Sequence, residues 1–402
     1  MMTLVTLSSL GYMGLKLTGT LPAKSPWRRV VWAVLGVFLF ALWASPWIYR
    51  SRPDAMTAWS VRLPLWTGYL FMGMAGFFLV FLIGIDLAKG LSGRLAALRG
   101  RPGMRGPATK PEAASLSAAG LSRREALQSL LPWGALGTAG ALSGFGLHTA
   151  LAGPKLVDVA VPEPKLHPDL EGLRIVQISD LHVGNTITRE YVENVVRIAT
   201  EAKPDLIALT GDFVDGSVAQ LARDIEPLWT LRAPLGVYYV PGNHEYYSGA
   251  DAWMREFARH GVTVLRNSHT VTQKGGARIL IAGVTDPRAG GFSAEDAPDP
   301  EKAVRGAPKD ADYRIFLAHQ PKQYVQAEVA GCDLQLSGHT HAGQFFPFNG
   351  IAALVHRYYR GLNRHEDRFW VHVNTGTGYW GPPNRLGIHA EVSLLRLTRN
   401  RA

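Results

Sequence analysis

The sequence predicts a chain of two parts, a set of apolar membrane helices followed by a mixed α/β domain. Three long apolar stretches lie before residue 155. The net charge of +10 comes from the same N-terminal part, because acidic and basic residues nearly balance after it. From Leu173 onward, short apolar runs typical of strands alternate with amphipathic segments typical of helices. This alternation is the pattern of an α/β domain.

Two stretches are apolar enough to cross a membrane as helices. Residues 30–49 and 63–85 carry no charged side chain, and each reaches the ~20 residues that span a hydrocarbon core of ~30 Å. Residues 1–17 are a further candidate, although Lys16 interrupts them. We therefore assign residues 1–99 to a membrane region with two or three spanning helices.

The next two segments connect this region to the α/β domain. Residues 100–125 are rich in Pro, Gly, Ala and Ser, which predicts a basic, flexible linker. Residues 126–154 are apolar, follow the Arg123–Arg124 pair and contain an Ala-Leu-Ala sequence near their end. They fit either a third membrane span or an internal twin-arginine-like signal. The excess of Lys and Arg at 89–125 indicates that this loop is cytoplasmic and that residues 155–402 lie outside the cytoplasm.

The composition argues against two other classes of protein. The basic excess lies between apolar stretches, where it indicates membrane topology, so we expect no nucleic-acid partner. The single cysteine, Cys332, permits neither an intrachain disulfide nor a thiolate metal cluster. It lies in an apolar run and is expected to be buried.

The α/β domain is predicted over residues 155–402. Strands are expected at 173–179, 205–210, 236–240, 278–284, 313–318, 333–336, 370–374 and 390–397, and helices at 188–203, 218–231 and 250–260. Residues 153–169 contain four prolines and are expected to act as a tether.

Five of these strands are followed by side chains suited to metal binding and proton transfer. They are Asp180 and His182, Asp212, Asn243 and His244, His319, and His339 and His341. Ligands of open α/β sheets bind outside the carboxyl ends of the strands, so we expect these residues at one edge of the sheet. Each motif alone is common in turns, but the series of five is specific.

This series resembles the motifs of calcineurin-like metallophosphoesterases: Asp-x-His, Gly-Asp, Gly-Asn-His-Glu, His and Gly-His-Thr-His. The resemblance covers residues 173–344. Segments 360–362, 374–378 and 383–387 are similar to the bacterial membrane-associated YkuE-like branch. The resemblance implies a β-sandwich flanked by helices, which the strand pattern alone does not distinguish from a single open sheet.

The resemblance also implies two divalent metal ions bridged by Asp212. Asp180, His182 and His341 would complete one site, and Asn243, His319 and His339 the other. Two such ions neutralise phosphate oxygens and activate a shared water as hydroxide. His244 is implied to stabilise the transition state or to protonate the leaving oxygen. Nitrogen and oxygen ligands favour Mn, Fe, Zn or Ni/Co.

We therefore expect a membrane-anchored phosphoesterase of the bacterial inner membrane. Its substrate would be a phosphodiester or a lipid-linked phosphate or pyrophosphate. Two alternatives stay open: a non-catalytic metal- or phosphate-binding outer domain of a membrane scaffold, and a cytoplasmic-face pyrophosphatase of the UDP-diacylglucosamine type if the topology is inverted. Aromatic residues that include Phe345 and Trp380 fit a substrate cleft, bilayer docking or ordinary packing. Asp215 and Asp286 lie near the motifs as candidate partners of the histidines, and Glu245 is assigned no role in the chemistry.

Overall fold

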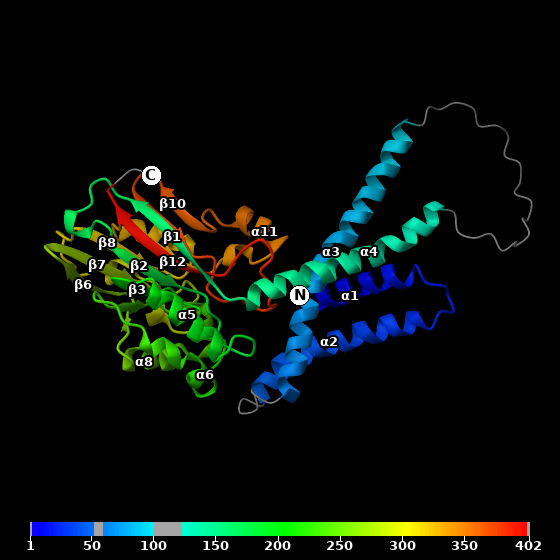
Figure 1. Cartoon of the computed structure of the whole chain (residues 1–402), viewed down its shortest axis with the longest axis horizontal. Helices are drawn as coiled ribbons and strands as arrows, with labels where there is room; N and C mark the ends of the chain where they lie inside the picture. The colour runs from blue at the N-terminus through cyan, green and yellow to red at the C-terminus, as the bar shows by residue number, and fades with distance from the viewer. Residues whose placement is uncertain (1, 52–58, 100–122, 400–402) are drawn as a thin grey trace, which may run out of the picture.

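The computed structural model describes residues 2–51, 59–99 and 123–399. They form a bundle of long helices beside a domain of strands and shorter helices (Figure 1). The predicted linker at 100–125 lies outside the described residues except for 123–125, which begin a helix.

The bundle contains the apolar stretches. Its helices are α1 (Met2–Thr18), α2 (Trp27–Ser51), α3 (Trp59–Arg99) and α4 (Arg123–Leu151). Within the described part of the chain, Trp27–Ala44 and Val61–Leu95 are long and apolar enough to cross a membrane. Phe77 of α3 is buried against neighbouring helices, yet Phe40 of α2 remains 71% exposed and Leu87 of α3 69% exposed. Apolar side chains on both the inward and the outward faces are typical of helices in a bilayer.

Polar contacts join α1 and α4 to this bundle. Lys16 of α1 forms an ion pair with Asp86 of α3 at 2.6 Å, so the charge that interrupts the first apolar stretch has a partner. The indole of Trp133 in α4 donates a hydrogen bond to Thr20 at 2.8 Å. Helix α4 is therefore packed as a member of the bundle.

The end of α2, the start of α3 and the end of α4 lie on the side of the bundle that faces the α/β domain (Figure 1). Residues 19–26 and the end of α3 lie on the far side. Ala150, in the last turn of α4, is fully buried in a core cluster of the α/β domain. The backbone N–H of Arg385 also donates to the carbonyl of Gly146 in α4 at 2.9 Å.

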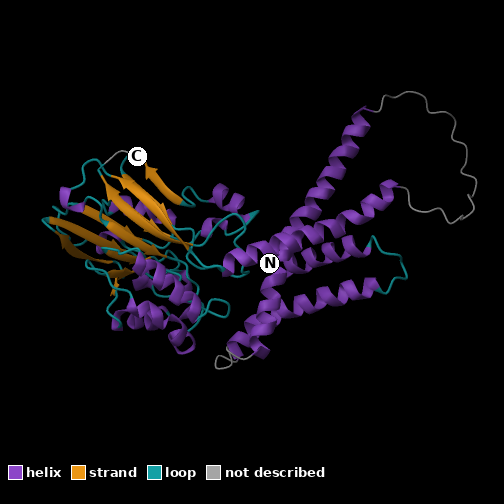
Figure 2. Cartoon of the chain, viewed as in Figure 1, coloured by secondary structure: helices purple, strands orange, loops and turns teal. Residues whose placement is uncertain are grey.

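Two six-stranded sheets form the centre of the α/β domain (Figure 2). The strands are β1 (Lys155–Pro162), β2 (Arg174–Ile178), β3 (Leu206–Leu209), β4 (Val237–Tyr239), β5 (Thr263–Val264), β6 (Ser268–Lys274), β7 (Ala277–Gly283), β8 (Tyr313–Leu317), β9 (Leu334–Ser337), β10 (Gly361–His365), β11 (Phe369–Val373) and β12 (Glu391–Thr398). The order is β1-β12-β2-β3-β4-β5 in one sheet and β10-β11-β9-β8-β7-β6 in the other.

The alternation of side chains along the strands divides the core into layers. Ile175 of β2 packs with residues of both sheets, including Ile315, whereas the next residue, Val176, packs with the helices outside. The helices of the domain are α5 (Arg189–Glu201), α6 (Val218–Ile225), α7 (Asn243–Ser248), α8 (Ala250–Arg259), α9 (Pro300–Ala303), α10 (Tyr324–Val329) and α11 (Phe348–Val355). The predicted sandwich of sheets flanked by helices is confirmed.

The predicted tether at 153–169 is wrong in its first half. Residues 155–162 form β1, which pairs in parallel with β12 from Lys155↔Glu391 to Pro162↔Thr398. Prolines stand at or beyond the ends of this segment, so they do not interrupt its hydrogen bonds, and β1 lies at the edge of its sheet.

The strands that carry the motifs meet at one end of the sandwich. Strands β2, β3 and β4 are parallel in one sheet, and β8 and β9 are parallel in the other. The predicted residues therefore come from two sheets rather than from one edge of a single sheet.

Candidate metal centre

The predicted residues that carry His or Asp side chains form two clusters at this end of the sandwich. In the first, Nε2 of His182 lies 3.1 Å from Nε2 of His341, which lies 3.5 Å from Oδ1 of Asp180. In the second, Nε2 of His319 lies 3.0 Å from Oδ2 of Asp212 and 3.2 Å from Nδ1 of His339.

Asp212 connects the two clusters. Its Oδ2, which touches His319 in the second cluster, is also 3.9 Å from Nε2 of His182 in the first. Its Oδ1 accepts the backbone N–H of His244 at 2.8 Å, which fixes the direction of the carboxylate. A single carboxylate oxygen thus faces both groups of ligand atoms.

The backbone is strained where these side chains leave their strands. The φ angles are 53° at Asp180, 53° at His182, 57° at Asp212, 70° at His339 and 48° at His341. A left-handed conformation costs a residue with a Cβ roughly 1–2 kcal/mol. Such strain is concentrated at functional sites, where the surrounding structure imposes it.

Two glycines allow the chain to approach the carboxylates closely. A Cβ on Gly242 would overlap Oδ1 of Asp212, and a Cβ on Gly338 would overlap Oδ2 of Asp180. The first residue of the Gly-Asn-His-Glu and Gly-His-Thr-His motifs must therefore be glycine, because a larger residue would overlap the neighbouring carboxylate.

Hydrogen bonds set which ring nitrogen of two histidines faces the centre. Nδ1 of His319 donates to the carbonyl of Thr210 at 2.8 Å, and Nδ1 of His182 donates to Oδ1 of Asp215 at 3.0 Å. In the neutral imidazole, both Nε2 lone pairs are then free for a cation.

His341 differs from these two histidines. Nη2 of Arg385 lies 3.0 Å from its Nδ1, and a guanidinium has only donors, so Nδ1 is the acceptor in this contact. Cation binding at Nε2 requires the proton on Nδ1, so this contact must relax when a cation is bound. Arg385 also donates to the carbonyl of Thr375 at 2.6 Å, which holds it in place.

Burial and neighbouring charges act in opposite directions on the acidic groups. Burial opposes ionisation of Asp212, but the neighbouring histidines, first among them His319, hold its pKa well below its usual value. Burial raises the pKa of Asp180. Burial and the charge of His319 lower the pKa of His339 to about 3, which keeps this ring neutral as a ligand must be.

The residues present fit divalent cations. Pairs of ring nitrogens face one another at 3.1 and 3.2 Å, where a shared cation would satisfy both. The side-chain Oδ1 of Asn243 is buried and has no hydrogen-bond partner among the described residues, so its lone pairs are available. Nitrogen and oxygen donors of this kind suit transition metals.

His244 lies beside the clusters with its ring partly exposed. Its Nδ1 is 2.6 Å from Oδ1 of Asp215, and its Nε2 is 4.0 Å from Oδ2 of Asp212. Burial disfavours the charged ring, but the hydrogen bond to Asp215 and the nearby carboxylates outweigh it and raise the pKa of His244 to about 9. The rings of Tyr247 and Trp380, each about half exposed, stand edge-on to the imidazole.

Two acidic residues organise the site in ways that the motifs did not define. Asp215 contacts both His182 and His244, and its position three residues after Asp212 was the available signal. Glu245 is fully buried and accepts the N–H groups of Asp212, Phe213 and Gly242 at 2.9, 2.6 and 2.7 Å.

The other acidic candidate, Asp286, acts on His319 through its charge, which contributes to raising the pKa of that ring. It accepts a hydrogen bond from Gln320 at 2.7 Å and contacts no proposed ligand histidine through an observed hydrogen bond.

A fold of two sheets with aspartate, histidine and asparagine gathered at the strand ends defines a class of metal-dependent hydrolases. The family model of the calcineurin-like phosphoesterases matches residues 173–343. This chain is 36% identical over 280 residues to an uncharacterized metallophosphoesterase of Helicobacter pylori, an alignment that covers 69% of this chain and 72% of the relative. It is 30% identical over 287 residues to the metallophosphoesterase YkuE of Bacillus subtilis, covering 69% of this chain and 98% of that protein.

A eukaryotic relative shares the same domain. A Danio rerio protein described as a transmembrane protein with metallophosphoesterase domain is 36% identical over 259 residues, which cover 63% of this chain and 59% of the relative. The chain thus matches little more than half the length of that relative. The chain belongs to the calcineurin-like metallophosphoesterase family.

Proposed function

We propose that this chain is a membrane-anchored hydrolase of phosphoric esters that works with two divalent metal ions. The observation that carries the proposal is that Asp212, which clusters with His319 and His339, also lies 3.9 Å from His182 of the other cluster, with the imidazole of His244 beside them.

In the proposed centre, Asp212 would take part in holding both ions. Asp180, His182 and His341 would hold one, and Asn243, His319 and His339 would hold the other. When bound, the ions would supply positive charge that offsets the anionic oxygens of a phosphoester and would lower the pKa of water. Their nitrogen and oxygen ligands favour Mn, Fe, Zn or Ni/Co.

His244 is the proposed proton donor to the leaving ester oxygen. Asp215 engages Nδ1 at 2.6 Å, so Nε2 is the nitrogen that faces the clusters. A proton on Nε2 is then directed at the ester oxygen of a phosphate held there. Asp215 stabilises the charged ring before the transfer and orients it.

We assign the chain to the bacterial inner membrane, with the catalytic domain outside the cytoplasm. The exposed apolar surface of the bundle supports membrane insertion. The basic segment 89–125 begins at the end of α3 that lies away from the catalytic domain, and an excess of Lys and Arg marks the cytoplasmic side. The contact of Trp133 with Thr20 supports α4 as a retained membrane helix rather than a signal.

Hydrolysis of bis-4-nitrophenyl phosphate by the full-length chain in detergent tests the proposed chemistry. The protein is stripped with a chelator and then given Mn²⁺. We expect turnover only with the metal, and a loss of more than about 100-fold in Asp212→Asn, which keeps the shape of the side chain but removes its charge. The control is Glu193→Gln, an exposed charge on α5.

Two results would contradict the proposal. One is an Asp212→Asn protein as active as the wild type. The other is a wild-type protein that binds Mn²⁺ with no turnover of phosphate monoesters or diesters, which would favour a non-catalytic binding domain.

A further inference from the structure

A cavity of about 1140 Å³ lies between the catalytic domain and the bundle. His182, Asp215 and His244 line it on the side of the metal centre. Leu42 of α2 and Leu65 of α3 line it on the side of the bundle. The cavity that reaches the proposed proton donor therefore has one wall made of the membrane helices.

The wall formed by the helices is apolar and lies within the candidate spans. Leu42 belongs to the span Trp27–Ala44, and Leu65 and Gly68 belong to the span Val61–Leu95. Leu65 is 3% exposed, so it is packed between its neighbours rather than turned to the surrounding lipid. An alkyl chain on this wall would remain in apolar surroundings while its polar end reached the metal centre.

Aromatic side chains connect the apolar wall to the catalytic side. Tyr69 of α3 lines the cavity, as Asp215 does on the catalytic side. Trp380 and Tyr247 stand beside His244 with 54% and 53% of their surfaces exposed. Amphipathic rings of this kind suit the junction between a polar head group and an acyl chain.

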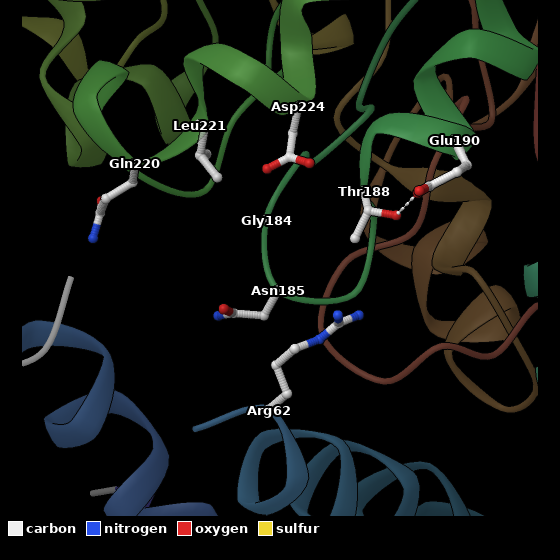
Figure 3. Close-up of a pocket in the computed structure, with 8 residues that line it drawn as sticks. All are labelled: Arg62, Gly184, Asn185, Thr188, Glu190, Gln220, Leu221 and Asp224. Atoms are coloured by element: carbon white, nitrogen blue, oxygen red, sulfur yellow. Dashed lines mark hydrogen bonds between the residues drawn. The ribbon is translucent and has the colours of Figure 1, made fainter. Parts of the chain in front are cut away.

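A second cavity of about 350 Å³ adjoins the first, and its lining includes Arg62, Glu190 and Asp224 (Figure 3). Both cavities include Gly184, Asn185 and Gln220 in their linings. Arg62 of α3 extends from the bundle toward the loop that carries Asn185 (Figure 3). Hydrogen-bonding groups are thus available where the two cavities meet.

The catalytic domain carries an apolar surface of its own next to α3. Phe345 packs against Phe77 of α3 with ring centroids 5.5 Å apart. Helix α11 follows it, and its Leu354 and Val355 are 89% and 70% exposed. An exposed apolar helix beside a span is suited to the membrane interface.

We propose that the cavity binds a phosphoester that carries a long apolar chain, with the chain on the wall formed by Leu42 and Leu65 and the phosphate at the metal centre. This inference rests on the proposed function. The oxygen of water forms a new bond to phosphorus and one proton of that water passes to solvent, while the bond from phosphorus to the leaving ester oxygen breaks and that oxygen takes the proton from His244. His244 then regains a proton from solvent. The products are an alcohol and a phosphate with one ester bond fewer.

A pair of esters with the same leaving group tests this substrate class. Full-length protein in nanodiscs is given hexadecyl 4-nitrophenyl phosphate or methyl 4-nitrophenyl phosphate with Mn²⁺, and 4-nitrophenolate is measured. We expect kcat/KM for the hexadecyl ester to exceed that for the methyl ester at least tenfold. Leu65→Ser and Leu42→Ser should each lower this ratio at least threefold. The matched control is Leu63→Ser, a leucine that is 59% exposed on the same helix and lies outside the cavity lining.

A crosslinking measurement gives a second readout that needs no turnover. Hexadecyl phosphate with a diazirine in its chain is photolysed in the nanodiscs, and the labelled peptides are identified by mass spectrometry. We expect label at Leu42 or within residues 65–69. Label confined to outward residues such as Leu87 would overturn the inference. Because this measurement needs no turnover, it also decides the question when a variant is too unstable for kinetics.

The outcomes separate this inference from the proposed function. Metal-dependent hydrolysis of both esters at equal kcat/KM, with no label on the cavity wall, would leave the function standing and overturn the inference. Label on the wall without hydrolysis of either ester would support the binding site and contradict the proposed chemistry.

Discussion

Oδ1 of Asp215 lies 2.6 Å from Nδ1 of His244. The same oxygen also receives the Nδ1–H of His182 at 3.0 Å, so one carboxylate connects a proposed metal ligand to the proposed proton donor. Movement of Asp215 would disturb both the first ligand cluster and the ring that protonates the leaving group.

Asp215→Asn should therefore make hydrolysis more dependent on the leaving group. The amide cannot stabilise a charged His244 as a carboxylate does, so proton donation weakens. We expect kcat/KM to fall about 10–100-fold for methyl aryl phosphates with poor leaving groups, and less for the 4-nitrophenyl ester. A purely structural defect would lower kcat/KM equally for all esters. This result would contradict the role of Asp215. The control is Asp251→Asn, an exposed carboxylate paired with Arg266.

Metal binding should raise the thermal stability of the chain. Bound cations would bring positive charge to the buried carboxylates of Asp180 and Asp212 and would be held by the ring nitrogens of the facing histidines. At a metal concentration of 100 times Kd, binding stabilises the folded state by about 2.7 kcal/mol. We expect Mn²⁺ to raise Tm in detergent, and Asp212→Asn to reduce this increase. An equal increase in both proteins would show that the cation binds elsewhere.

Gly338→Ala should destabilise the catalytic domain. The added Cβ would overlap the carboxylate of Asp180 and the hydroxyl of Ser179, and forcing them apart costs about 1–3 kcal/mol. The Tm and the affinity for Mn²⁺ should both be lower than in the wild type. Gly350→Ala is the matched control, because its Cβ would meet nothing within 4 Å in α11, and this variant should be equally or more stable. Identical behaviour of the two variants would contradict the close approach at Gly338.

His372 should make folding sensitive to mildly acidic pH. Burial lowers the pKa of this ring from 6.5 to about 4, while Nδ1 donates to Gln177 at 2.8 Å. The unfolded chain thus binds more protons between pH 4 and 6.5, so this stabilisation is complete above about pH 6.5 and is lost as the pH falls toward 4. The loss is at most roughly 3 kcal/mol. Denaturant unfolding from pH 7 to 4 should show a weaker pH dependence in His372→Gln, and an unchanged dependence would contradict this assignment.

The orientation in the membrane can be read from cysteine labelling. In a Cys332→Ala background, Glu301→Cys places a thiol on the catalytic domain, and Ala23→Cys places one in the loop on the far side of the bundle. We expect a membrane-impermeant maleimide to label Glu301→Cys in intact spheroplasts and Ala23→Cys only after lysis. The reverse pattern would put the catalytic domain in the cytoplasm and favour the cytoplasmic-face alternative.

Local sequence patterns located most of the candidate site because its residues follow buried strands directly. The strand expected at 173–179 is β2 at Arg174–Ile178, and Asp180 follows it. The side chains converge although β3 and β8, for example, lie in different sheets. A strand joins one sheet or the other through pairing with distant segments of the chain. The alternation of apolar and polar residues along the strand does not show which sheet it joins. The roles of these residues as ligands stay predictions.

The features that sequence patterns missed depend on long-range contacts. Strand β1 reads as a proline-rich connection because its partner is β12, at the other end of the domain. Glu245 has no metal-binding pattern of its own, and its function is to bind the N–H groups of Asp212 and Gly242. Of the aromatic residues near the last motif, Trp380 lines the cavity and Phe345 packs on α3.

The short connection between the bundle and the sandwich limits how far the metal centre can travel. Only residues 152–154 separate α4 from β1, Ala150 is buried in the domain core, and β1 is paired with β12 along its whole length. The catalytic domain therefore cannot sweep across the solvent as it would on a long linker. With the bundle in the membrane as proposed, its reacting atoms would stay at one height relative to the bilayer, so the depth of an ester bond in the leaflet would become a criterion of selection alongside its chemistry.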